Sequence, residues 1–229
     1  MKWGFLSVNH IISLVVAAGI ITGLFFLLRN RRDRTKQIVL GILSFSGIAA
    51  IIFNLLVWNS PLEYLPLHLC SLNALVLPVA VFTRSKTLNN LLLLWSFGAL
   101  FALILNLSVA DASIFSWVFL FYYFPHVLEL GIPILMFALK LVKKDVKCIA
   151  STMLITILSY TVIHFINLLI NDYAIKNNIL DSSANILQVN YMFSITPENP
   201  VLALFYEIIP HPYWYMYLSF AFIALYLAG

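Results

Sequence analysis

Long apolar runs, separated by short loops that hold most of the basic residues, constrain this chain more than any other feature. The first run covers residues 10–28 and is followed directly by a basic cluster at residues 29–36. A helix of about 20 apolar residues is long enough to cross the roughly 30 Å hydrocarbon core of a bilayer. The chain is 62% hydrophobic and only 10% charged, whereas a soluble domain is about 25% charged. The sequence therefore predicts an integral membrane protein.

We expect an all-α, polytopic membrane helix bundle of about seven transmembrane helices, which form a single integral membrane domain over residues 1–229. The expected spans are 10–28, 38–58, 65–82, 88–107, 117–139, 148–170 and 211–227, with a long outer loop at 171–200. The apolar stretch that includes the fifth expected span contains Pro125 and Pro133, and it is too long for one straight membrane helix. We expect its first part to lie partly in the membrane interface, with the span itself beginning near Pro125.

The basic residues predict the orientation of the bundle. Of the 13 lysines and arginines, all but Lys2 and Lys176 follow the first, third and fifth expected spans. The positive-inside rule makes these loops cytoplasmic, so the N-terminus lies outside and the C-terminus lies in the cytoplasm. Topology thus accounts for the net charge of +4, and we expect no nucleic-acid partner. Cys70 and Cys148 fall on opposite membrane sides, so we expect no disulfide.

A polar motif lies at the start of the third expected span. It reads Leu65-Pro66-Leu67-His68-Leu69-Cys70-Ser71-Leu72-Asn73. Pro66 suits the first turn of a helix, and Cys70 then lies near a helix N-terminus, which makes a thiol a better nucleophile. Polar side chains at membrane depth usually have a function. A small buried hydrophobe is the alternative interpretation of Cys70.

The expected topology brings further polar residues to the depth of this motif, in the outer leaflet. The third expected span begins with His68 and Cys70, and the fifth has His126 and Glu129 near its outer end. The sixth has His164 and Asn167 near its outer end. His126 and Glu129 share a helical face, so the carboxylate can hold the imidazole, which would act as the base for Cys70. His68 faces away from Cys70 on a regular helix and could bind a head group. Asn73 or backbone N–H groups could stabilise an oxyanion.

Two alternatives use the same histidines. His68, His126, His164 and Glu129 could ligate zinc in a metal-dependent hydrolase, although no H-E-x-x-H pattern is present, and we expect no metal and no cofactor. A transporter for lipids or small molecules would have polar residues distributed through the membrane depth, whereas here they gather at one end. His164 and Asn167 could also simply join two helices, and we expect His211 to be structural.

Four motifs resemble those of the bacterial YwaF-like membrane proteins, which are similar to the eukaryotic transmembrane protein 164 family. They are Pro66-Leu67-His68-Leu69-Cys70, Phe124-Pro125-His126, Asn190-Tyr191-Met192-Phe193 with Pro197, and Pro212-Tyr213-Trp214-Tyr215. The resemblance covers the third to seventh expected spans. Family members often have glycine where this chain has Met192 and His211.

The resemblance implies an acyltransferase that acts on phospholipids through Cys70, with His126 as partner and His68 in the same site. Asn190 and Tyr191 would help to cover that site. The residues expected to contact substrate are Asn73, His164, Asn167, Asn190, Tyr191, Tyr213 and Trp214. The implied partners are membrane phospholipids and a possible lipid-modified acceptor, in a bacterial plasma membrane with the active site facing outside.

Overall fold

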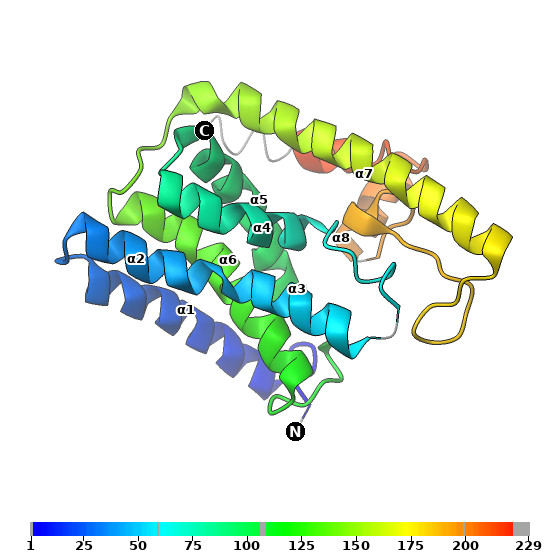
Figure 1. Cartoon of the computed structure of the whole chain (residues 1–229), viewed down its shortest axis with the longest axis horizontal. Helices are drawn as coiled ribbons and strands as arrows, with labels where there is room; N and C mark the ends of the chain where they lie inside the picture. Colours follow the sequence, from blue (N-terminus) through cyan, green and yellow to red (C-terminus); the bar gives the residue numbers. More distant parts are fainter. Residues whose placement is uncertain (1, 59, 106–108, 199, 222–229) are drawn as a thin grey trace. The chain divides into compact units, whose positions relative to one another are not determined.

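The computed structural model describes residues 2–58, 60–105, 109–198 and 200–221 (Figure 1). The long elements of this part of the chain are all helices. In order they are α1 (Val8–Leu28), α2 (Asp33–Ser44), α3 (Ser46–Val57), α4 (Leu69–Thr83), α5 (Lys86–Leu105), α6 (Trp117–Ala138), α7 (Ile149–Asn177) and α8 (Pro200–Ile208). Short 3-10 turns lie at Val146–Cys148 and Tyr191–Phe193.

The prediction of an all-α, multi-pass membrane protein is confirmed. Five segments are long and apolar enough to cross a membrane, and they are Val8–Leu28, Asp33–Val57, Lys86–Leu105, Trp117–Ala138 and Val146–Asn177; α4 is apolar but shorter. The count of about seven spans and the orientation stay predictions. The last expected span, 211–227, is helical over 216–221. Residues 222–227 lie outside the described part of the chain, as do 106 and 107 of the fourth expected span.

The chain divides into two compact units. The first comprises Met1–Ala50 and Cys70–Asp145, and the second comprises Ile51–Leu69 and Val146–Gly229. The expectation of one membrane domain stays a prediction.

In the first unit α6 is the central helix, and it contacts α1, α2 and α5 (Figure 1). Trp3, which is completely buried, packs edge-on against Phe119 of α6 and donates from Nε1 to Ser13 Oγ at 2.8 Å. The backbone of this N-terminal segment bonds to the segment before α6, with Trp3 N–H donating to Ala112 O at 2.9 Å. The N-terminal residues therefore complete the core around α6.

α6 runs unbroken through Pro125 and Pro133. The helix does not begin near Pro125: it begins at Trp117, the first residue of the expected span 117–139, because Ser116, nine residues before Pro125, caps it and accepts a hydrogen bond from Phe119 N–H at 3.2 Å. Where along this helix the membrane begins stays a prediction. A proline inside a membrane helix is tolerated where neighbouring groups satisfy the backbone carbonyls that it frees.

Two other helix boundaries differ from the predicted ones. α4 begins at Leu69, so Pro66 precedes the helix instead of lying in its first turn; a tight turn from Leu65 to Leu67 occupies that stretch. α7 continues past residue 170 to Asn177. Its last turns contain an ion pair between Asp172 and Lys176 at 2.7 Å, which supports a helix without adding hydropathy.

The basic loops after α1, α4 and α6 meet at one end of the first unit. Arg84 donates to Gln37 Oε1 at 3.0 Å and lies 4.0 Å from Asp33. Lys36 Nζ donates to Asp33 at 3.1 Å and lies 3.5 Å from Leu139 O. The three loops that the charge pattern assigned to one membrane side therefore share one end of the helix bundle.

Candidate functional site

One face of α4 combines the candidate nucleophile with an amide. Cys70, Asn73, Ala74 and Leu77 follow the i, i+3, i+4, i+7 spacing of a single helical face. Asn73, Ala74 and Leu77 are almost completely buried, and Cys70 is half-buried as a free thiol in the first turn of the helix. Because the rest of this face is small or apolar, it packs into the first unit and takes the thiol and the amide with it.

Glu129 of α6 belongs to the same cluster. A Cβ atom built on Gly47 of α3 would lie 2.5 Å from Ala74 Cβ and 2.8 Å from Glu129 Oε1. Gly47 therefore lets α3, α4 and α6 approach one another at this level. The carboxyl of Glu129 is near enough to Cys70 to interact electrostatically with the thiol.

The cluster contains polar atoms that the protein leaves unsatisfied. Asn73 Nδ2, Asn73 Oδ1 and Glu129 Oε2 are buried, and none has a hydrogen-bond partner among the described residues. Leaving a buried polar group unpaired costs about 1–3 kcal/mol, so such groups call for an explanation. Here they offer one donor and two acceptors to a molecule that enters the cluster.

His126 is held by the backbone of its own helix. Its Nδ1 lies 2.6 Å from Tyr122 O, and since a carbonyl only accepts, Nδ1 carries a proton; in the neutral ring the lone pair is then on Nε2. The expectation that Glu129 orients this ring is wrong. Helical side chains lean toward the N-terminus, which turns the ring toward Tyr122, one turn earlier, with the ring centroids 4.3 Å apart.

In the second unit, two asparagines of α7 hold the loop that contains the Asn-Tyr motif. Asn167, which is completely buried, donates to Tyr191 O at 2.8 Å and accepts from Tyr191 N–H at 3.1 Å. Asn171, one turn later, donates to Val189 O at 3.0 Å and accepts from Val189 N–H at 2.7 Å. Each amide therefore binds both main-chain groups of one loop residue.

The other α7 candidates join the same network. His164 Nδ1 lies 3.0 Å from Ser194 Oγ, which also accepts from Asn167 at 2.9 Å. The ring of Tyr213 packs on His164 with centroids 4.9 Å apart, and the backbone N–H of Tyr213 donates to Ser194 O at 2.8 Å. Trp214, beside Tyr213, is about half exposed, at 52%.

The side chains of the Asn-Tyr motif mainly stabilise the fold of the loop. Asn190 donates to Glu198 Oε1 at 2.6 Å and accepts from Ile195 N–H at 2.9 Å, while the Tyr191 hydroxyl bonds to Leu62 O. His68 meets the ring of Tyr191 edge-on at 5.2 Å. Met192 has φ of 54°, a conformation that glycine adopts most easily.

The predicted site residues are thus divided between the two units. The first unit holds Cys70, Asn73, His126 and Glu129. The second holds His68, His164, Asn167, Asn190, Tyr191, Tyr213 and Trp214. A single site that combines all of them stays a prediction. Gly47, Tyr122 and Ser194 were missed, and only Gly47 had a signal, as a small residue that permits close helix packing in a membrane.

The described residues contain no group of three His, Cys, Asp or Glu side chains that could hold a metal ion. The metal-dependent alternative therefore finds no donor set within this part of the chain.

Comparison with known proteins gives one match. No curated protein and no solved structure matches the chain. The model of the TMEM164 family matches residues 5–229, which includes every residue of the candidate site. This confirms the resemblance to the transmembrane protein 164 family that the motifs indicated, while the bacterial YwaF-like branch stays a prediction. With the match extending over nearly its whole length, the chain belongs to the TMEM164 family.

Proposed function

We propose that the protein is a membrane-embedded acyltransferase. It moves a fatty acyl chain from a phospholipid donor to a lipid or lipid-modified acceptor, through a thioester on Cys70. The observation that carries the proposal is the cluster in which a free thiol accompanies a buried, unsatisfied amide and a carboxyl. A structural cysteine needs neither of these neighbours.

In the first half-reaction the Cys70 sulfur attacks an ester carbonyl of the donor lipid. His126 Nε2 accepts the thiol proton as the carbon–sulfur bond forms. Asn73 Nδ2 donates to the carbonyl oxygen while it carries negative charge, together with the free N–H groups of the first turn of α4. The carbon–oxygen bond then breaks, and His126 returns the proton to the departing lysolipid hydroxyl.

In the second half-reaction the acceptor takes the acyl chain. Its hydroxyl or amine gives a proton to His126 Nε2 and attacks the thioester carbonyl, and Asn73 again stabilises the oxyanion. The carbon–sulfur bond breaks and Cys70 regains its proton. Glu129, whose Oε2 has no partner in the described structure, hydrogen-bonds to the polar head of the lipid near the thiol.

We propose that this chemistry takes place at the outer leaflet of a bacterial plasma membrane. The first turn of α4 lies at the other end of this helix from Arg84, which follows its last residue. The positive-inside rule assigns Arg84 and the other basic loop residues to the cytoplasm. The donor and acceptor are then lipids that reach the thiol from within the bilayer.

Intact-protein mass spectrometry after incubation with phosphatidylcholine tests the proposal. The wild type should gain the mass of one fatty acyl group, and hydroxylamine should remove it. Cys70→Ala should show no adduct, whereas Cys148→Ala, which lacks the other free cysteine, should label like the wild type. Full acyl-transfer activity in Cys70→Ser or Cys70→Ala would refute the thioester mechanism.

A further inference from the structure

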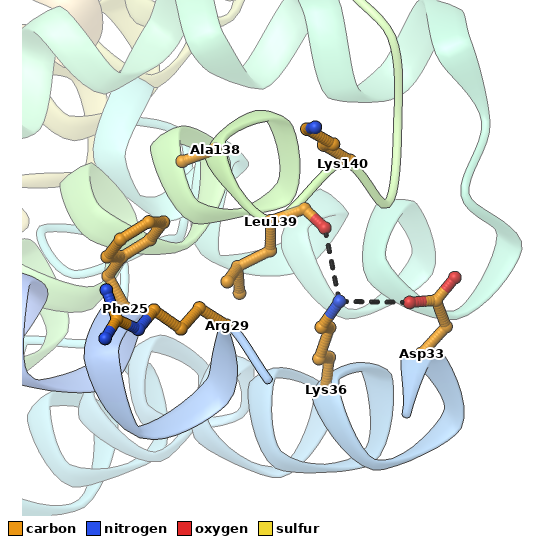
Figure 2. A pocket seen from close by; sticks show the side chains of 7 residues that line it. All are labelled: Phe25, Arg29, Asp33, Lys36, Ala138, Leu139 and Lys140. Carbon is orange, nitrogen blue, oxygen red and sulfur yellow. Dashed lines mark hydrogen bonds and ion pairs between the residues drawn. The ribbon is translucent and has the colours of Figure 1, made fainter. Parts of the chain in front are cut away.

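A second site lies at the basic end of the first unit, outside the cluster around Cys70. A cavity of about 410 Å³ opens between the C-terminal end of α1, the first turn of α2 and the C-terminal end of α6. Figure 2 shows its lining, in which Arg29, Lys36 and Lys140 come from these three different elements.

The lining of this cavity has an excess of positive charge. The lining has three cations and one carboxylate, Asp33, which already binds Lys36 at 3.1 Å and lies 4.0 Å from Arg84 outside the lining. The side chain of Lys36 is only 10% exposed. Its ammonium has three N–H donors, and the described contacts use two of them, to Asp33 and to Leu139 O (Figure 2). A buried ammonium with spare donor capacity favours an anionic ligand.

The surface beside the cavity is apolar. Phe26 of α1, which follows the cavity-lining Phe25 in the chain, is 55% exposed. α1 is a candidate membrane span, and α2 is the first part of another, Asp33–Val57. Arg29 lies over the ring of Phe26 at 4.7 Å, which holds a guanidinium at the boundary between apolar surface and cavity. A ligand with a charged head and hydrocarbon chains matches both surfaces at once.

Lys140 occupies a backbone position that favours glycine. It follows the C-cap of α6 with φ of 60°, and Leu141 N–H donates to Met136 O at 2.9 Å while Lys140 N–H donates to Phe137 O at 2.9 Å. This is the bonding pattern of the Schellman motif, whose left-handed residue is usually glycine. The chain therefore has a lysine beside the cavity at a cost in stability.

We infer that this cavity binds the phosphate of an anionic phospholipid, whose acyl chains lie along the exposed face of α1 at Phe26. Basic pockets between the ends of membrane helices are suited to such head groups, and the cytoplasmic leaflet, where the basic loops are expected, contains most anionic lipid. The site is independent of the thiol chemistry proposed above, so either can fail without the other.

The test uses the full chain in phosphatidylcholine nanodiscs, with and without phosphatidylglycerol of the same acyl composition. Native mass spectrometry counts bound phosphatidylglycerol, and thermal unfolding reports the stabilisation that specific binding provides. The wild type should retain phosphatidylglycerol and unfold at a higher temperature with it. Lys36→Gln and Lys140→Gln should each bind about fivefold more weakly, the effect of about one charge near a membrane surface.

Two further variants separate lipid binding from folding, and a specific site from general attraction between lysines and anionic lipid. Lys140→Gly should unfold at a higher temperature than the wild type in phosphatidylcholine alone, yet gain less from phosphatidylglycerol. Lys143→Gln removes an exposed charge that does not line the cavity and should bind like the wild type. An unchanged phosphatidylglycerol effect in Lys140→Gly, or an equal loss in Lys143→Gln, would overturn the inference. Equal stabilisation by inorganic phosphate alone would overturn the lipid assignment.

Discussion

Gly47 and Glu129 approach so closely that a single methyl group would not fit between their helices. A Cβ on Gly47 would lie 2.8 Å from Glu129 Oε1 and 2.5 Å from Ala74 Cβ. The carboxyl that faces the thiol is thus positioned by a residue with no side chain, and the geometry of the candidate site depends on how closely α3 packs.

Replacing Gly47 should therefore affect stability and activity together. Gly47→Ala forces Ala74 or Glu129 to move, and overpacking of this kind costs about 1–3 kcal/mol. We expect a lower unfolding temperature in detergent and slower acyl transfer. Gly19→Ala is the matched control, because nothing lies within 4 Å of its added Cβ; in a helix it should stabilise by about 0.5–1 kcal/mol. Equal behaviour of the two variants would argue against close packing at Gly47.

Asn73 should contribute to function at the expense of stability. Its side chain is completely buried and both of its polar atoms lack partners in the described structure. Asn73→Leu removes that penalty, so we expect stability to be preserved or raised by about 1 kcal/mol. Acyl transfer should fall about 100-fold, as when an oxyanion donor is lost. Thermal unfolding and single-turnover acylation measure the two effects; a variant that loses stability and keeps its activity would identify Asn73 as a packing residue.

His126 should act in the chemical step. His126→Ala removes the proposed proton acceptor, and loss of a general base typically reduces the rate about 100- to 10,000-fold. The decrease should appear in kcat, with KM for the donor lipid little changed, because the ring is not assigned to lipid binding. His211→Ala, which removes an exposed histidine in the second unit, serves as control. A purely KM effect in His126→Ala would contradict the assigned role.

Asn167 should hold the loop at Tyr191. Asn167→Ala leaves Tyr191 N–H and Tyr191 O without the amide that binds both, and buried unpaired groups of this kind cost about 1–3 kcal/mol each. Hydrogen exchange at the Tyr191 amide should accelerate far more than exchange within the core of α7. Asn177→Ala removes only an exposed bond to Tyr173 O, so exchange at Tyr191 should not change. An unaltered Tyr191 amide in Asn167→Ala would contradict the proposed clamp.

Ala184 offers a test of backbone strain in the loop that follows α7. Its φ of 62° lies in the left-handed region, which costs a residue with a Cβ about 1 kcal/mol or more. Ala184→Gly relieves this strain but gains conformational freedom in the unfolded chain, so we expect a net stabilisation of about 0.5 kcal/mol. Asn178→Gly, at φ of 50°, should have a smaller effect because asparagine tolerates this conformation. Chemical unfolding followed by tryptophan fluorescence compares the two.

Hydropathy predicted which segments form long apolar helices but not where these helices begin and end. Leu65 and Leu67 are as apolar as the residues of α4, yet they precede the helix, because hydropathy reports burial and not backbone conformation. The end of α7 was missed for the converse reason. Residues such as Asp172 and Lys176 lower the hydropathy while their ion pair supports the helix.

The candidate site shows the same limit. The sequence correctly placed Cys70 near the start of a helix. It wrongly paired His126 with Glu129, because residues three apart share a face but their side chains lean in one direction along it. The approach of Glu129 to the thiol arises from packing between helices distant in sequence, and no local pattern encodes it.

At Val189 and Tyr191 the side chains of Asn171 and Asn167 bind only main-chain atoms, and every residue type except proline presents the same N–H and C=O groups. Substitutions at Val189 and Tyr191 therefore leave the anchoring bonds available. These four bonds therefore depend on the conformation of the loop backbone and not on the identity of its side chains.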